Sequence, residues 1–167
     1  PSLIPNEDED ISKQLSIAFK EQGINILTGV KVENISTENN IANVNITNGD
    51  QISSIEAERV LISVGISGNI EDIGLDNVGI ATERGFIVVD NNMMTNVSSI
   101  YSIGDVTGKM PLAHVASAQG VLAVENIAGL NPTPINYTEI PRAIYCKPQV
   151  ASLGLTEAQA RNQGHSI

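Results

Sequence analysis

The sequence predicts an α/β protein, and three observations lead to this class. Only 3% of its 167 residues are aromatic, so the core has to be built mostly from aliphatic side chains. Segments with a helical spacing of apolar residues alternate with short segments rich in β-branched residues. Residues 60–65, VLISVG, are apolar almost throughout, which is typical of a strand covered on both faces in a parallel sheet.

The first third of the chain has the pattern of one helix followed by strands. Residues 6–23 begin with acidic side chains, which suit the positive end of a helix dipole, and end at a glycine. Residues 24–27 form a short apolar run typical of a buried strand, and residues 30–35 alternate like a half-exposed strand. Alternation over 41–57 around Asn-Gly at 48–49 predicts a hairpin with a two-residue turn, or part of a meander.

The middle of the chain has the pattern of a second unit. Residues 66–84 are rich in Gly, Asn and Asp, and we expect an inter-domain crossing there. Two strands are expected at 85–90 and 99–104, and a helix at 113–128. Gly120 lies inside this helix, where glycine costs about 1 kcal/mol relative to alanine, so we expect close packing at that point.

The last segment begins after a linker at 131–134, NPTP. Strands are expected at 140–146 and 150–155. Thr156 and Gln159 have the spacing of a capping box, which predicts a short helix that ends at the next glycine.

Charge and composition exclude several classes of function. The formal charge of −10, without a basic cluster, argues against nucleic acid as a partner. No apolar run approaches the roughly 20 residues that cross a bilayer, and the N-terminal residues lack the pattern of a signal peptide. We therefore expect a cytoplasmic protein without a membrane partner. The single cysteine, Cys146, excludes an intrachain disulfide, a CxxC pair and a multi-cysteine zinc site, and no metal site is expected.

The chemically informative segment is 99–120, SIYSIGDVTGKMPLAHVASAQG. A strand that runs into Gly104 and Asp105 would place a carboxylate at the carboxyl end of a sheet strand, where open α/β sheets bind ligands. Asp105 can accept hydrogen bonds from sugar-like hydroxyl groups, and Gly104 lets a ligand approach the backbone. By position alone, an aspartate that caps the next turn is an equally good explanation. The helix that starts near Ala113 has free N–H groups that can face an electron-rich ligand.

This segment resembles a known family. TNVSSIYSIGDV followed by LAHVASAQG is similar to the second FAD-binding signature of the flavoprotein disulfide reductases. LIPNEDEDISKQL, VLISVG, RGFIVVD and YCKPQVASLGLTEAQA also resemble that family, in order and over essentially the whole chain. LAH at 112–114 is the form found in members that oxidise dihydrolipoyl groups, whereas glutathione and mercuric reductases usually have other residues there.

The resemblance implies an internal fragment of partial FAD/NAD(P)-binding Rossmann-like domains with three layers (ββα). Residues 1–68 resemble the end of the NAD domain, 69–136 the end of the FAD domain, and 137–167 the start of an α+β interface (dimerisation) domain. The sequence contains no GxGxxG phosphate loop and no CxxxxC redox pair, and the family's His-Glu base pair would lie beyond Ile167. No catalytic residue is therefore expected within the chain, which alone should be inactive.

The resemblance also implies FAD and NAD as cofactors and assigns residues to each. The implied ribityl-hydroxyl acceptor is Asp105, beside Gly104. The segment implied to lie against the flavin pyrimidine ring is made by Leu112, Ala113 and His114, and its backbone matters more than the imidazole. The positions implied to line the NAD site are Val32 and Gly65. The family commonly has Arg after the glycine matched by Gly65, whereas this chain has Ile66.

For the intact protein the resemblance implies a homodimer that uses NAD⁺ to reoxidise dihydrolipoyl groups. Those groups belong to 2-oxo acid dehydrogenase or glycine cleavage complexes. Two alternatives remain at this point: another pyridine nucleotide-disulfide reductase of the glutathione or mercuric reductase type, and a nucleotide-binding module without catalytic activity.

Overall fold

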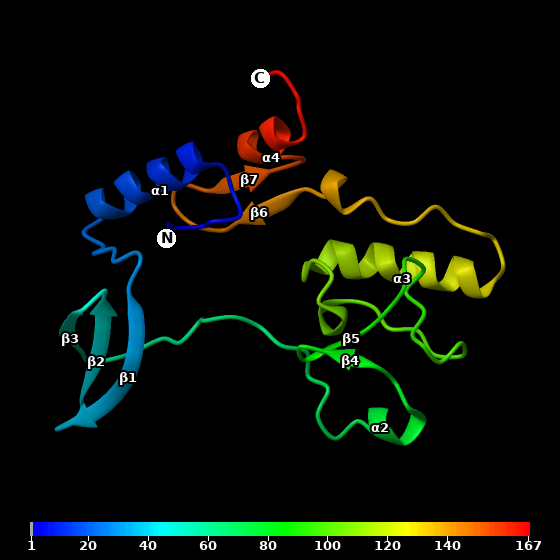
Figure 1. Ribbon diagram of the computed structural model, residues 1–167, viewed down its shortest axis with the longest axis horizontal. Coiled ribbons are helices and arrows are strands. Elements are labelled where there is room, and N and C mark those ends of the chain that lie inside the picture. Colours follow the sequence, from blue (N-terminus) through cyan, green and yellow to red (C-terminus); the bar gives the residue numbers. More distant parts are fainter. Residues whose placement is uncertain (1) are drawn as a thin grey trace. The chain divides into compact units, whose positions relative to one another are not determined.

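The computed structural model describes residues 2–167, which divide into two compact units (Figure 1). The terminal unit combines the residues up to 63 with residues 141–167, and the central unit comprises residues 64–140. Both units contain helices and short sheets, as an α/β sequence predicts. Within residues 2–167, no helix is both long enough and apolar enough to cross a membrane.

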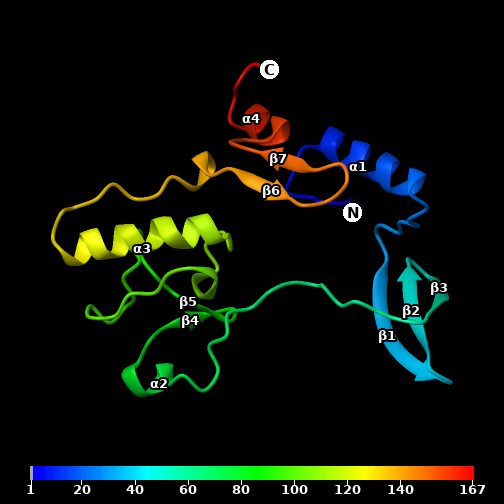
Figure 2. The ribbon, with the colours of Figure 1, turned by 180° about the vertical axis from the view of Figure 1, so that it is seen from behind.

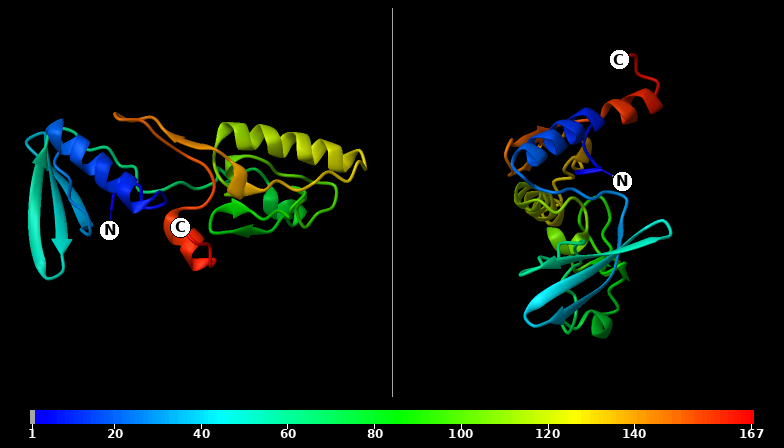
Figure 3. Two further views of the ribbon diagram at one scale, coloured as in Figure 1. Left: turned by 90° about the horizontal axis from the view of Figure 1, so that it is seen from above. Right: turned by 90° about the vertical axis from the view of Figure 1, so that its left-hand side faces the viewer.

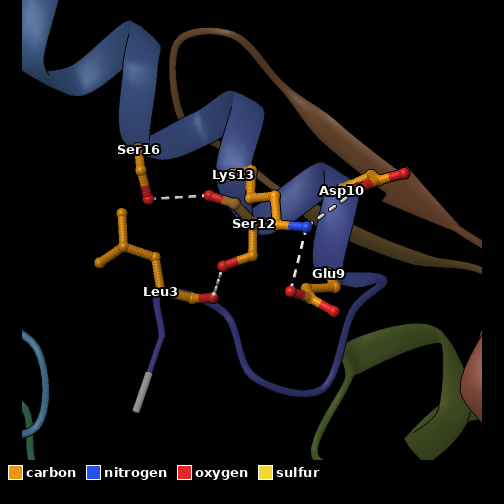
Figure 4. Close-up of polar contacts among 6 residues, drawn as sticks. All are labelled: Leu3, Glu9, Asp10, Ser12, Lys13 and Ser16. Atoms are coloured by element: carbon orange, nitrogen blue, oxygen red, sulfur yellow. Dashed lines mark hydrogen bonds and ion pairs between the residues drawn. The ribbon is translucent and has the colours of Figure 1, made fainter.

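The terminal unit begins with helix α1 (Glu9–Glu21), which confirms the helix expected at 6–23. Figure 4 shows how the chain before the helix is fastened to its first turn. The buried hydroxyl of Ser12 donates a hydrogen bond to the Leu3 carbonyl oxygen. On the exposed side, the Lys13 ammonium group lies 3.0 Å from the Glu9 carboxylate.

A three-stranded antiparallel meander follows in the order β1-β2-β3 (Figure 2). Its strands are β1 (Lys31–Glu38), β2 (Ile41–Asn48) and β3 (Gln51–Ala57). The hairpin expected at 41–57 is therefore confirmed, as part of a meander. The turn, however, lies one residue later than expected.

That turn consists of Gly49 and Asp50, because Asn48 still pairs with Gln51 in the ladder. Gly49 has a φ of 59°, which glycine adopts without steric cost. The Asn-Gly signal thus located the hairpin correctly, but Asn48 ends the strand and does not take part in the turn.

The register of the meander separates an apolar face from a polar one. Val44 lies between Ile35 on β1 and Ile55 on β3, so these three side chains share a face. On the opposite face the Asn45 amide donates a hydrogen bond of 2.7 Å to the Asn34 side-chain oxygen. The alternation of apolar and polar residues along the sequence therefore corresponds to the alternation of side chains between the two faces of the sheet.

The end of the chain completes the terminal unit with a hairpin and a helix. Its elements are β6 (Arg142–Ile144), β7 (Val150–Ser152) and α4 (Glu157–Asn162). Both hydrogen bonds of the capping box between Thr156 and Gln159 are formed, which confirms the helix start expected there. Helix α1 lies beside the β6-β7 hairpin, since the Gln22 side chain donates to the Lys147 carbonyl oxygen at 2.8 Å.

The central unit is built around one long helix. Its elements are α2 (Leu75–Val78), β4 (Thr82–Glu83), β5 (Phe86–Ile87), the 3-10 turn η1 (Asp105–Thr107), α3 (Ala113–Ile127) and the 3-10 turn η2 (Tyr137–Glu139). Figure 3 shows α3 along one side of the loops and short strands of this unit. Leu122 and Ala123 of α3 pack on Met93, which is fully buried.

Close packing at Gly120 is confirmed. A Cβ atom at this position would lie 3.3 Å from Cδ1 of Ile103, so the segment before η1 touches the helix there. The helix expected at 113–128 is confirmed as well, and the glycine that follows it, Gly129, has a positive φ of 72°.

Six expected strands are wrong or reduced. Residues 24–27 and 60–65 form no strand, and Leu61 is 91% exposed. Residues 85–90 keep only the two residues of β5, and residues 99–104 form one isolated bridge, through Tyr101. The strands expected at 140–146 and 150–155 shorten to the three residues each of β6 and β7. A strand exists only beside a hydrogen-bonding partner, and no strand in the described part of the chain pairs with 60–65. All sheets formed by residues 2–167 are antiparallel, so the expected parallel sheet is not observed.

Candidate functional site

The residues singled out for flavin binding lie together in the central unit, where η1 approaches the first turn of α3. Gly104 precedes η1 with a φ of 75°, and a Cβ atom there would lie 3.4 Å from Cβ of Ala116. Asp105 is the first residue of η1 and its side chain is exposed. The close approach of Gly104 to α3 therefore holds Asp105 beside the start of the helix.

The carboxylate of Asp105 receives no hydrogen bond from any residue that the structure describes. The turn is closed by Thr107 instead: its hydroxyl donates to the Gly104 carbonyl oxygen at 2.8 Å and accepts from the Lys109 N–H at 3.3 Å. The alternative explanation, an aspartate that caps this turn, is therefore not supported. Asp105 leaves two acceptor oxygens directed to solvent or to a ligand.

The far side of η1 rests on β5. A Cβ atom at Gly108 would lie only 2.8 Å from Cγ of Phe86, so the ring packs directly against the backbone that follows η1. Gly108 also has a φ of 67°, which L-residues rarely adopt. Any larger residue here would force the Phe86 ring or the backbone to move. The contact between Gly108 and Phe86 therefore sets how closely η1 approaches β5.

The first turn of α3 provides backbone donors. Leu112 is the N-cap residue, with extended backbone and without a side-chain cap. The first intrahelical hydrogen bond runs from the Ala116 N–H to the Leu112 carbonyl oxygen at 3.0 Å. The Ala113 N–H, at the first helical position, consequently has no acceptor inside the helix. Ala113 and His114 are exposed, Leu112 is half-buried and Val115 is fully buried, so the Ala113 end of this turn faces the surface.

The two positions predicted for NAD lie in different units. Val32 is on the apolar face of β1 in the terminal unit, and 52% of it is exposed. Gly65 stands near the start of the central unit, and a Cβ atom there would meet nothing within 4 Å. Their assignment to NAD remains a prediction.

The terminal unit also contains an open cavity of about 570 Å³ over the apolar side of the meander. It is lined by residues of β1 and β2, among them Ile35 and Ala42, and by residues 58–60. None of the residues that the sequence predicted to bind FAD or NAD lines it.

Cys146, the only cysteine of the sequence, is half-buried, and its thiol lies 3.0 Å from the Pro148 carbonyl oxygen. With respect to metal sites, no group of three or more His, Cys, Asp or Glu side chains within residues 2–167 is arranged to hold a metal ion.

One residue of the site was missed by sequence reasoning. Gln119 on α3 is fully buried, and its side-chain oxygen accepts a hydrogen bond of 2.6 Å from the Gly104 N–H. The available signal was its position four residues after Val115 and three before Leu122. These spacings place a polar residue on the apolar face of the helix.

Comparison with known families decides the affiliation of the chain. Residues 1–120 match the family described as pyridine nucleotide-disulphide oxidoreductase, which is most of the 167 residues. The chain belongs to this family. The predicted relationship to the flavoprotein disulfide reductases is thereby confirmed.

Individual curated proteins also align along the chain. The dihydrolipoyl dehydrogenase of Mycobacterium leprae is 47% identical over all of the chain, which covers 36% of that protein. The dihydrolipoyl dehydrogenase of Bacillus subtilis is 42% identical over 99% of the chain, which covers 35% of that protein. The chain therefore spans about a third of the length of these relatives.

Two solved structures share the fold of this chain. The crystal structure of LpdA from Mycobacterium tuberculosis superposes with a TM-score of 0.85 and 28% identity, over 95% of this chain and 34% of that one. The Cu(II) complex of RclA, an HOCl-induced flavoprotein disulfide reductase from Escherichia coli, gives a TM-score of 0.84 and 27% identity, over 98% and 36%. These matches confirm the predicted fold class, partial Rossmann-like domains of the disulfide reductases.

Proposed function

We propose that the chain is part of a dihydrolipoyl dehydrogenase that binds FAD and uses NAD⁺ to reoxidise dihydrolipoyl groups. Sequence support comes from relatives of that name, which align along the chain at 41–47% identity. The observation that carries the proposal is structural. The carboxylate of Asp105, without a hydrogen-bond donor among the described residues, stands beside an uncapped helix start.

These residues fit the flavin half of FAD. The two oxygens of Asp105 are acceptors for ribityl hydroxyl groups, and Gly104 adds no side chain that would obstruct them. The N–H group of Ala113, at the first helical position of α3, is a donor for the carbonyl edge of a pyrimidine ring, and His114 follows it in the same turn. The α3 dipole favours negative charge at that edge by about 0.3–1 kcal/mol, and by up to about 2 kcal/mol in a partly buried geometry.

FAD, when bound, supplies the electron transfer between a dithiol and the nicotinamide ring. The contribution of this chain is to bind and orient the cofactor: η1 holds the acceptor and α3 presents the donors. No proton transfer is assigned to His114, because its backbone N–H suffices for the proposed role.

We also propose the domain assignment and the NAD site for the full-length protein. Residues 1–68 belong to its NAD domain, 69–136 to its FAD domain and 137–167 to its interface domain. Val32 and Gly65 line NAD, and Ile66 leaves this corner without the guanidinium that the family commonly has. A homodimer, a dihydrolipoyl substrate and a cytoplasmic location complete the proposal.

Substitution of Asp105 in the full-length protein tests the flavin site. Asp105→Ala removes a charge-assisted hydrogen bond of about 1.5–3 kcal/mol, which lowers FAD affinity roughly tenfold to hundredfold. Asp105→Asn loses less, because its amide oxygen still accepts. Asp76→Ala, at an exposed aspartate of α2, is the matched control and keeps the affinity. FAD bound per subunit after dialysis gives the result, and wild-type retention by Asp105→Ala contradicts the assignment.

A second candidate, a disulfide reductase with another substrate, is supported by the similarity to RclA. The two candidates differ in the substrate that the full-length protein uses. Dihydrolipoamide with NAD⁺ is the pair expected for a dihydrolipoyl dehydrogenase. Faster turnover of glutathione disulfide or mercuric ion with NADPH would favour the second candidate.

A further inference from the structure

The buried face of α3 contains one residue of unexpected polarity. Along this helix, which is described throughout, the buried residues are Val115, Gln119, Leu122 and Ala123. Three of them are aliphatic, whereas Gln119 carries an amide and has no exposed surface. Burying an amide without hydrogen bonds reduces the free energy of unfolding. Gln119 is therefore tolerated in this position only if its hydrogen bonds are formed.

The oxygen and both N–H groups of the Gln119 side-chain amide are hydrogen-bonded, each to a different residue. Its oxygen accepts from the Gly104 N–H at 2.6 Å. Its nitrogen donates to the Lys109 carbonyl oxygen at 3.3 Å and to the Tyr137 hydroxyl at 3.0 Å. An amide has two N–H donors, and both have a partner here.

Two of these partners, Gly104 and Lys109, lie at the two ends of the loop that contains η1. Gly104 directly precedes η1 and Lys109 directly follows the Gly108 cap of η1. A single side chain on α3 therefore holds both ends of the loop that carries Asp105. The two ends also make opposite demands, since one presents a donor and the other an acceptor. A neutral amide satisfies both, whereas an ionised carboxylate or an aliphatic chain does not.

We propose that Gln119 is a positioning residue for the flavin site, which clamps the loop 104–109 so that Asp105 is held in place beside α3. This inference rests on the proposed function, because it concerns how that site is preorganised. A ligand bound by a rigid loop loses less free energy to ordering than one bound by a mobile loop. Gln119 touches no ligand itself and acts through the backbone of Gly104 and Lys109.

Two substitutions in the full-length protein test the clamp through FAD affinity, measured by quenching of flavin fluorescence over a pH series from mildly acidic to mildly alkaline. Gln119→Met keeps the length of the side chain but leaves the Gly104 N–H and Lys109 carbonyl oxygen unpaired. We expect its affinity for FAD to fall by about tenfold at every pH.

Gln119→Glu distinguishes the clamp from simple packing. A protonated carboxyl group accepts from Gly104 and donates to Lys109 or Tyr137, whereas the ionised group has no donor. Burial raises the pKa of such a carboxyl group, so the protonated form is populated at mildly acidic pH. The affinity of this variant should approach that of wild type at low pH and fall as pH rises. The titratable residues on the first turn of α3 and the adjoining segments, Asp105, Lys109, His114 and Tyr137, are present in both proteins, so comparing the two affinities at each pH removes their contribution.

Leu122→Ala is the matched control, because Leu122 is buried on the same face of α3 and packs on Met93, and it makes no hydrogen bond through its side chain. It should lower the unfolding temperature of the FAD-free protein at least as much as Gln119→Met while changing FAD affinity far less. Equal losses of affinity in the two variants would mean that Gln119 is only a packing residue. Should Gln119→Met fail to fold, the pH dependence of Gln119→Glu decides alone.

The result for wild type separates this inference from the function on which it rests. If wild type binds FAD and Asp105→Ala loses it, but both Gln119 variants bind like wild type at every pH, only the inference is wrong. If wild type binds no FAD, the proposed function fails and the inference with it.

Discussion

The side chains of Glu7 and Arg142 form an ion pair at 3.3 Å across 135 positions of the sequence. Only 7% of the Glu7 side chain and 26% of the Arg142 side chain are exposed. Next to Glu7, the Asp8 carboxylate accepts a hydrogen bond of 2.7 Å from the Glu157 N–H. The segment before α1 is thus joined by polar contacts to β6 and α4 within the terminal unit.

Arg142→Met should weaken this junction. It leaves the buried Glu7 carboxylate without its cationic partner, at a cost of about 1–3 kcal/mol. Hydrogen exchange of the β6-β7 amides reports the loss locally. The double substitution with Glu7→Gln should recover part of it, because no unpaired buried charge then remains.

The control for this prediction is Arg161→Met on α4. Arg161 pairs with Glu157 at 2.7 Å, but both side chains are more than half exposed. Exposed pairs of this spacing are worth only about 0.3–0.5 kcal/mol. Equal effects of Arg161→Met and Arg142→Met would show that burial of the Glu7 pair has no consequence.

Gly108→Ala should destabilise the central unit through a steric collision that Gly104→Ala does not make. Both glycines have positive φ, 67° and 75°, so alanine is strained at either position whatever the space around it. Only at Gly108 does the new Cβ also collide with a ring, 2.8 Å from Cγ of Phe86, whereas at Gly104 it makes an ordinary contact of 3.4 Å. Thermal unfolding measures the difference.

Reducing the ring tests the cause. Adding Phe86→Leu to Gly108→Ala should recover part of the lost stability, and adding it to Gly104→Ala should not. If both double variants respond alike, the contact between Phe86 and Gly108 does not explain the cost.

Features with local causes were predictable from the sequence. The capping box at Thr156 and Gln159 and the glycine after α3 act within one helical turn, and the structure has both. The Asn-Gly pair located the β2-β3 hairpin but not the turn residues, because strand pairing continues through Asn48. A turn signal is local, whereas register depends on the partner strand.

Features with distant causes were not predictable in this way. Residues 60–65 have the apolar run of a covered strand, yet Leu61 and Val64 are each 91% exposed, since strand formation needs a partner that the pattern cannot supply. At the candidate site, Asp105 and the helix start were identified by resemblance, and the structure brings them together. Gln119 was missed because its partners lie 10 to 18 positions away along the chain.

Glu33 offers a prediction on pH. The Lys31 ammonium group donates to one of its carboxylate oxygens at 2.9 Å and the Thr47 hydroxyl to the other at 2.9 Å. These bonds hold the pKa of Glu33 below its usual range, with the Lys31 bond the larger cause. The stabilisation is present above the pKa of the unfolded chain and is lost as pH falls through the lower pKa of the folded state.

Lys31→Met should therefore raise the pKa of Glu33 toward its usual range, as followed by NMR titration. Thr47→Val should raise it less. Because these groups are exposed, added salt should weaken the Lys31 contribution in wild type. An unchanged pKa in Lys31→Met would contradict the assigned cause.

Ala113→Pro tests whether the backbone of α3 serves the flavin site. Ala113 is the first helical residue, a position where proline is tolerated and removes only the N–H. Leu112 before it is already extended, with φ −135° and ψ 137°, as the residue before a proline requires. Loss of one neutral hydrogen bond should weaken FAD binding roughly two- to twelvefold while the unfolding temperature of the FAD-free protein stays unchanged. His114→Gln keeps every backbone donor and should retain the wild-type affinity. The reverse order, with His114→Gln weaker than Ala113→Pro, would assign the role to the imidazole.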